Sequence, residues 1–92
     1  MIILVIVGVR DPGECFRIVR RVAFEGRKVM MLFVGDGCRI AEDPGTVESL
    51  ASFARLYALS EDCPKPAKGV TLVDYDGWVK LLEMCNKTFS WT

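Results

Sequence analysis

Four cysteines, Cys15, Cys38, Cys63 and Cys85, are the side chains of this sequence best suited to chemistry, and the chain has no histidine. A thiol acts as a nucleophile only as the thiolate, which a helix N-terminus or a nearby cation favours and apolar surroundings disfavour. Without histidine no Ser/His/Asp or Cys/His arrangement can form, so hydrolytic mechanisms that need an imidazole base are excluded. The chemistry open to the chain is that of the thiols themselves.

The cysteine spacings match no zinc-binding pattern, and histidine is the commonest metal ligand. We therefore expect no metal and no organic cofactor. The apolar run at residues 1–9 lacks the basic lead and the cleavage site of a signal peptide, and it is too short to span a bilayer. We expect a cytoplasmic protein with reduced thiols and no membrane contact.

Composition points to one small globular domain over residues 1–92. Lys and Arg number 12, Asp and Glu also number 12, and no basic cluster stands out. Direct binding of nucleic acid is therefore not expected, because such binding depends on a concentrated positive charge. With a net charge of zero and 51% hydrophobic residues, the domain has little self-repulsion, and we expect a homo- or hetero-oligomer.

The first part of the chain predicts a strand, a helix and a strand. Residues 2–9 are an almost unbroken run of Ile, Val and Leu, typical of a strand covered on both faces of a parallel sheet. Asp11 is placed to cap a helix that Gly26 ends. Residues 29–34 are a second apolar strand, which ends in the turn Gly35–Gly37.

Two more helices follow. Asp43 or Thr46 can cap the first of them, and Asp74 or Asp76 can cap the last one. The Pro- and Lys-containing segment 60–68 reads as an exposed loop. The apolar positions expected on the last helix are Trp78, Leu81, Leu82 and Cys85. Further strands are expected at residues 56–59, 69–73 and 88–91.

Strands that alternate with helices at this spacing predict βαβ crossovers. The expected fold is α/β, a three-layer α/β/α sandwich with a mostly parallel sheet of about five strands. In such a sheet, reactive groups collect at the carboxyl edge of the strands. Cys15, Cys38 and Cys63 each follow one of the first three strands. Cys85 instead reads as a small buried hydrophobe.

The three edge cysteines differ in their neighbours. Glu14 opposes thiolate formation at Cys15, whereas Arg39 follows Cys38 directly and favours it. Cys63 has acidic neighbours, but we expect its loop to be exposed and mobile, which favours reactivity. Cys63 and Cys38 are the candidate catalytic residues. An unreactive, shielded thiol is the alternative for each, and a disulfide between these two is a further alternative.

Other features carry weaker signals. Gly35–Gly37 lacks the third glycine of a dinucleotide fingerprint and the Lys-Ser/Thr of a P-loop, so a tight turn in which Asp36 caps a helix is the better interpretation. The hypothesis that the chain is a free-standing nucleotide-binding module is therefore supported only by the expected α/β architecture. Trp78 and Trp91 could form a platform for a cofactor or partner, although packing is the commoner use of tryptophan.

The sequence as a whole resembles the DsrE/DsrF/DsrH-like sulfur-relay superfamily, most closely its TusB/DsrH branch. The resemblance covers essentially the whole chain, and its most specific part is the C-terminal third. It rests on a helix that ends in Glu-Gly, the turn Gly35–Gly37, the segments 56–62 and 73–82, Lys68-Gly69, and Ser90-Trp91.

This resemblance implies a small cytoplasmic subunit of a complex of related DsrE/F/H-like subunits. Such complexes pass persulfide sulfur to a downstream sulfur-carrier protein, for tRNA 2-thiouridine formation or for sulfur oxidation. The sulfur-bearing cysteine of DsrE/TusD-type subunits falls just after the third strand, where this chain has Leu59. The TusB/DsrH branch often lacks that cysteine.

Two hypotheses follow. In the first, the chain is an interaction subunit that lacks the usual sulfur-bearing cysteine and shapes the active site of a neighbour. In the second, it carries sulfur itself through Cys63 or Cys38. At most, then, the chain is a sulfurtransferase-complex subunit.

Overall fold

The computed structural model describes residues 1–9 and 12–92. In this part of the chain, five parallel strands form one sheet in the order β4-β3-β2-β1-β5. The strands are β1 (Ile2–Val7), β2 (Lys28–Phe33), β3 (Arg55–Leu59), β4 (Val70–Val73) and β5 (Lys87–Trp91). The helices are α1 (Gly13–Phe24), α2 (Cys38–Ala41), α3 (Pro44–Ala51) and α4 (Tyr75–Met84), with a 3₁₀ turn η1 (Gly35–Gly37).

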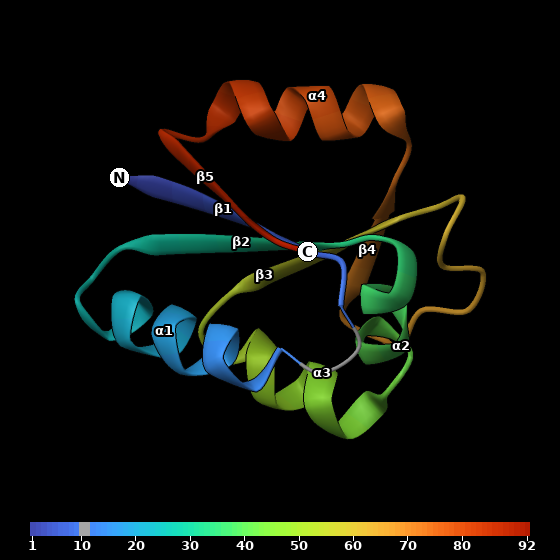
Figure 1. Ribbon diagram of the computed structural model, residues 1–92, viewed down its shortest axis with the longest axis horizontal. Helices are drawn as coiled ribbons and strands as arrows, with labels where there is room; N and C mark the ends of the chain where they lie inside the picture. Colours follow the sequence, from blue (N-terminus) through green and yellow to red (C-terminus); the bar gives the residue numbers. More distant parts are fainter. Residues whose placement is uncertain (10–11) are drawn as a thin grey trace.

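The elements form three layers (Figure 1). Helix α4 covers one face of the sheet, and α1, α2 and α3 lie on the other. The expected three-layer α/β/α sandwich is confirmed, and every strand pairing in it is parallel. None of the helices in residues 1–9 and 12–92 is long and apolar enough to cross a membrane.

The core follows from the alternation of side chains along the central strands. Ile3 and Val5 of β1 pack into the cluster on the α1–α3 face, whereas Leu4 and Ile6 pack with Leu81 of α4. Because both faces are covered, β1 is apolar at every position, which is why its sequence shows no polar alternation.

Strand β5 closes the sheet beside β1. Its residues pair in parallel register with β1, from Ile3 opposite Lys87 to Val7 opposite Trp91. Just before β5, the side-chain oxygen of Asn86 accepts a hydrogen bond from the Ile2 amide at 2.8 Å. The beginning of β1 and the approach to β5 are therefore joined, although 84 residues separate them.

Helix α1 is amphipathic, as the sequence predicts. Cys15 and Val19 are buried, whereas Arg17, Arg20 and Arg21 are exposed. The helix is followed by Gly26 at φ 87°, a left-handed conformation that glycine adopts without a steric penalty. The expected cap Asp11 lies outside the described residues.

Helix α4 begins at the first of the two predicted caps. The Asp74 carboxylate accepts a hydrogen bond from the Gly77 amide at 2.8 Å. Leu81 is buried, but Leu82 is 42% exposed and Cys85 lies one residue beyond the helix. The expected place of Leu82 on the apolar stripe facing the sheet is therefore wrong, whereas Cys85 is half-buried against the same cluster as Leu81.

Between β2 and β3 the chain forms two α-helices, whereas the sequence pattern predicts one there. The short helix α2 precedes α3, whose N-cap is Asp43. The Asp43 side chain accepts a hydrogen bond from the Thr46 hydroxyl at 2.6 Å and makes no cap bond to a backbone amide. Asp43 and Thr46 thus act together at this helix start.

Candidate functional site

The carboxyl edge of the sheet is built around η1. The Val34 amide donates to the Val7 carbonyl at 2.9 Å, and the Gly37 amide donates to the Val34 carbonyl at 2.9 Å. A Cβ at Gly37 would lie 2.1 Å from the Val7 oxygen, so only glycine fits there. Gly35 has φ 52°, which also favours glycine. The predicted tight turn is confirmed.

The role expected for Asp36 in this turn is wrong. The N-cap of α2 is Gly37, and no side chain makes a cap hydrogen bond there. Asp36 is itself a residue of η1 and is exposed, one position too early to reach the free amides of α2.

Cys38 is the first residue of α2 and is only 3% exposed. Its thiol donates a hydrogen bond to the Phe33 carbonyl at 3.5 Å. Cys38 follows the turn η1 directly, and its side chain packs into the core cluster on the α1–α3 face of the sheet. From its place in the sequence, Arg39 is expected to favour ionisation of Cys38. The pKa of Cys38 is instead set by burial and by Cys63, Asp62 and Glu42.

Cys63 is fully buried, so the expectation that its loop exposes it is wrong. The reason is topological. The loop joins two adjacent parallel strands, β3 and β4, without a helix, so it must itself cross the α2–α3 side of the sheet. Hydrogen bonds fix its path: the Cys63 amide donates to the Leu59 carbonyl at 3.0 Å, and the Ala67 amide donates to Ala41 at 2.8 Å.

The structure brings Cys38 and Cys63 together. Burial raises the pKa of Cys38 to about 12, with further increases from the proximity of Cys63 and a hydrogen bond with it. The pKa of Cys63 is also raised, chiefly by burial, although its hydrogen bond with Cys38 partly offsets this. Both side chains are therefore neutral thiols near neutral pH. A resting thiolate nucleophile is absent from this pair.

A carboxylate joins the two loops that carry these thiols. Asp62 accepts a hydrogen bond from the Gly35 amide at 2.8 Å. The negative charge of Asp62 also raises the pKa of both Cys38 and Cys63. Sequence reasoning missed this contact because the residues are 27 positions apart and no local motif marks it.

Leu59 ends β3, where the resemblance places the sulfur-bearing cysteine of other subunits. Its side chain is 2% exposed, and its carbonyl accepts the amides of both Asp62 and Cys63 at 3.0 Å. An apolar, buried side chain therefore lies at this position. The nearest thiol along the chain, that of Cys63, is buried in the core.

The other two cysteines lie elsewhere. Cys15 lies on α1 and is 2% exposed, and burial raises its pKa. Cys85 is half-buried, with its thiol 4.0 Å from the Met30 sulfur, and burial raises its pKa as well. Within residues 1–9 and 12–92, no group of three or more Cys, Asp or Glu side chains is arranged to hold a metal ion.

The two tryptophans differ in environment. Trp78 is half-buried against the α4-side cluster and stacks on Tyr75, with ring centroids 6.2 Å apart. Its indole Nε1 is buried and has no hydrogen-bond partner in the described part of the chain. Trp91, at the end of β5, is 36% exposed.

The fold and this edge define a class of protein: a small, parallel α/β/α domain whose cysteines at the carboxyl edge are buried. A solved protein of this architecture is the YchN protein from E. coli, with a TM-score of 0.72 and 10% sequence identity over 98% of this chain and 97% of that one. This likeness shows a shared fold. Neither protein-family models nor curated proteins gave a match to the sequence.

Proposed function

We propose that this chain is a subunit of a cytoplasmic sulfur-relay complex of the TusB/DsrH type, in which it supplies contact surface and not a sulfur-bearing thiol. Its partners are related DsrE/F/H-like subunits and a downstream sulfur-carrier protein. The complex passes persulfide sulfur for tRNA 2-thiouridine formation or for sulfur oxidation.

The observation that carries this proposal is the state of the thiols at the carboxyl edge. To accept sulfur, a thiolate must attack the outer sulfur of a donor persulfide, so that the donor's S–S bond breaks and the donor leaves as a thiolate. Cys38 and Cys63 are 3% and 0% exposed, and the pKa of each is raised. By the resemblance, Leu59 stands where other subunits have their sulfur-bearing cysteine, and its side chain is apolar and buried.

The exposed apolar surface supports an interaction role. On α4, Val79 and Leu82 lie three residues apart on one face of the helix and are 51% and 42% exposed. Large apolar side chains that cluster on a small domain commonly mark protein–protein contact sites. A partner subunit seated on α4 would reach the carboxyl edge, because α4 begins just after β4 ends there.

A second candidate function, sulfur carrier through Cys63 or Cys38, rests on one observation. The loop that buries Cys63 has exposed residues at positions 60–62 and is joined to η1 through the Asp62–Gly35 hydrogen bond. Breaking that bond is the step that the carrier function requires, because it gives a donor persulfide access to the thiols.

Intact-mass measurement after incubation with glutathione persulfide separates these functions. The interaction role predicts no reducible sulfur adduct on the folded chain, and the same chain unfolded in urea is the positive control for thiol reactivity. Co-expression with a cysteine-bearing DsrE-type relative should then yield a stable complex. A sulfur adduct on the folded protein that Cys63→Ser or Cys38→Ser abolishes, while Cys85→Ser leaves it, would establish the carrier role instead.

A further inference from the structure

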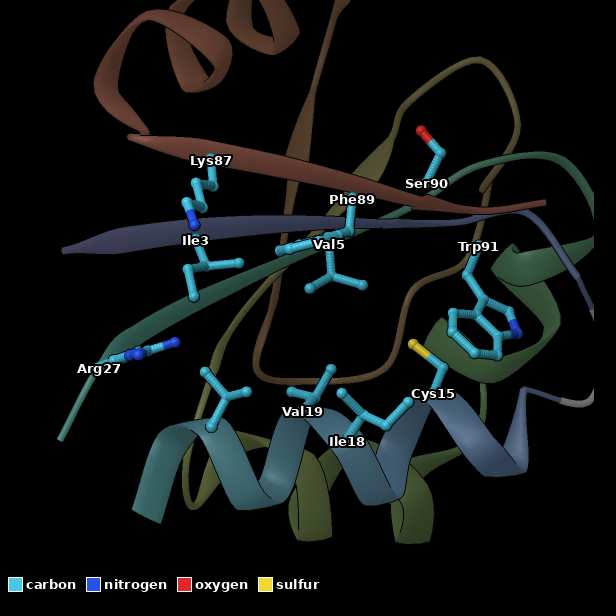
Figure 2. Close-up of a pocket in the computed structure, with 11 residues that line it drawn as sticks. Ile3, Val5, Cys15, Ile18, Val19, Arg27, Lys87, Phe89, Ser90 and Trp91 are labelled. Atoms are coloured by element: carbon cyan, nitrogen blue, oxygen red, sulfur yellow. The ribbon is translucent and has the colours of Figure 1, made fainter. Parts of the chain in front are cut away.

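A groove runs between α1 and the outer strand β5, with a volume of about 390 Å³. Its floor consists of Ile3 and Val5 of β1 and Val19 of α1, and its outer wall includes Phe89 and Trp91 of β5 (Figure 2). We call this space the α1–β5 groove.

The groove exists because β5 has no helix beneath it. Helix α1 packs against β2, two strands away, and every residue of β5 remains exposed. Parallel sheets are normally covered on both faces. Phe89 is 53% exposed on this uncovered face, whereas its partner in register, Val5, is only 5% exposed.

Two cations stand at one end of the groove. Figure 2 shows Arg27 and Lys87 together at this end, with Cys15 and Trp91 at the other. Along β5, the separation from Lys87 to Trp91 corresponds to about 13 Å at the rise of an extended strand. In the described part of the chain, Arg27 and Lys87 make no ion pair, since the salt bridge found there joins Arg17 to Glu14.

We propose that the α1–β5 groove binds a small amphipathic anion, an alkyl or aryl carboxylate. Its apolar body would lie along Val5, Val19 and Phe89, and its carboxylate would lie between Arg27 and Lys87. The volume falls in the range of small-molecule sites, which are mostly apolar with a few polar groups that orient the ligand. An arginine beside a lysine supplies directed hydrogen bonds and charge for a carboxylate.

The depth of the groove favours a slim ligand over a flat protein surface. The floor residues Ile3, Val5 and Val19 are only 3% to 5% exposed, so they are reached only from between helix and strand. This inference is independent of the sulfur-relay proposal, because it uses neither Cys38 nor Cys63.

Trp91 provides the signal for a binding test. The sequence has two tryptophans, Trp78 and Trp91, and Trp91 lines the groove. In the Trp78→Phe variant, all tryptophan fluorescence therefore comes from Trp91. We expect decanoate to shift its emission in a saturable manner. Two exposed cations should make decanoate bind about five- to twentyfold tighter than 1-decanol, and decyltrimethylammonium should bind more weakly still.

Charge variants locate the carboxylate. Arg27→Gln and Lys87→Gln should each weaken decanoate binding by about two- to fivefold and leave 1-decanol binding unchanged. Lys28→Gln is the matched control. This substitution removes one positive charge at the residue next to Arg27. Lys28 lies two residues before Met30 on β2 and so is on the α4 face of the sheet, away from the groove. Lys28→Gln should therefore leave decanoate binding unchanged.

Three results would overturn the proposal. The first is equal affinity for the three ligands, which would remove the role of charge. The second is unchanged decanoate affinity in the Arg27→Gln/Lys87→Gln double variant, with the fold verified by circular dichroism. The third is the absence of any saturable signal, which would leave the groove to a protein partner.

Discussion

The Asp62 carboxylate accepts a hydrogen bond from the Gly35 amide at 2.8 Å, and this contact joins the loop after β3 to the turn after β2. Both segments adjoin the Cys38–Cys63 pair. One exposed hydrogen bond thus helps to cover two thiols that the core surrounds on their other sides. Accessibility of these thiols is coupled to the integrity of that contact.

We expect Asp62→Ala to increase the native-state labelling rate of Cys63 by a thiol-specific reagent. Loss of the Gly35 contact loosens the loop, and loss of the negative charge lowers the pKa of both thiols. Because the bond is exposed, the free energy of unfolding should fall by only about 1 kcal/mol. The measurement is labelling followed by peptide mass analysis. Asp36→Ala, which removes an exposed carboxylate from the facing turn, should label at the rate of the unchanged protein.

A dependence of stability on alkaline pH follows from Cys38. Its pKa rises from an ordinary 9.0 to about 12 in the folded chain. Between these values the unfolded chain has lost the proton and the folded chain still holds it, so the free energy of unfolding falls as pH rises, by up to about 1.4 kcal/mol per pH unit. Urea midpoints at pH 8 and pH 10.5 measure the slope. Cys38→Ala should show a shallower slope, and an unchanged slope would contradict the assignment.

Gly37→Ala should destabilise the fold severely. The new Cβ would lie 2.1 Å from the Val7 oxygen, and backbone stands on both sides of that contact. We expect a loss of about 3 kcal/mol or more in the free energy of unfolding. Gly45→Ala is the matched comparison in α3, because its Cβ would meet only the Asp43 carboxylate, at 4.0 Å. That change should be neutral or stabilise by up to about 1 kcal/mol. Equal losses in the two variants would argue against the geometry of η1.

Trp78→Phe should cost less than about 1 kcal/mol. The substitution loses part of the apolar contact of Trp78, but it also removes a buried indole Nε1 that has no partner in the described residues. Trp78→Ala, which leaves a cavity under α4, should cost about 3 kcal/mol. Urea unfolding monitored by circular dichroism compares the two. A large loss in the phenylalanine variant would indicate that the Trp78 indole N–H donates a hydrogen bond in the folded protein.

Local patterns account for most of what the sequence predicts correctly. The buried strands at β1 and β2 show as apolar runs. Helix α1 shows through its periodicity and the glycine that follows it, and α4 shows through its cap Asp74. Each of these signals comes from residues close together in the chain. The alternation of strand and helix then restricts the topology to a parallel sheet.

The candidate site was harder to predict, because its character depends on contacts between distant segments. The loop around Cys63 contains proline, lysine and acidic residues, which is a composition typical of exposed turns. It is buried at Cys63 because the loop has to act as a crossover between β3 and β4. Helix α2 is likewise hard to predict, because its four residues are too few to show the 3.6-residue hydrophobic repeat of a helix.

The pairing of β1 with β5 also affects how this domain is made on the ribosome. β1 is synthesised first and can pair with β2 soon afterwards, but its other edge stays open until residues 87–91 have been translated. Until then, β1 is an apolar strand with free backbone groups, the kind of edge that invites pairing with another nascent chain. Completion of the domain therefore waits for β5, and β1 keeps one open edge during that interval.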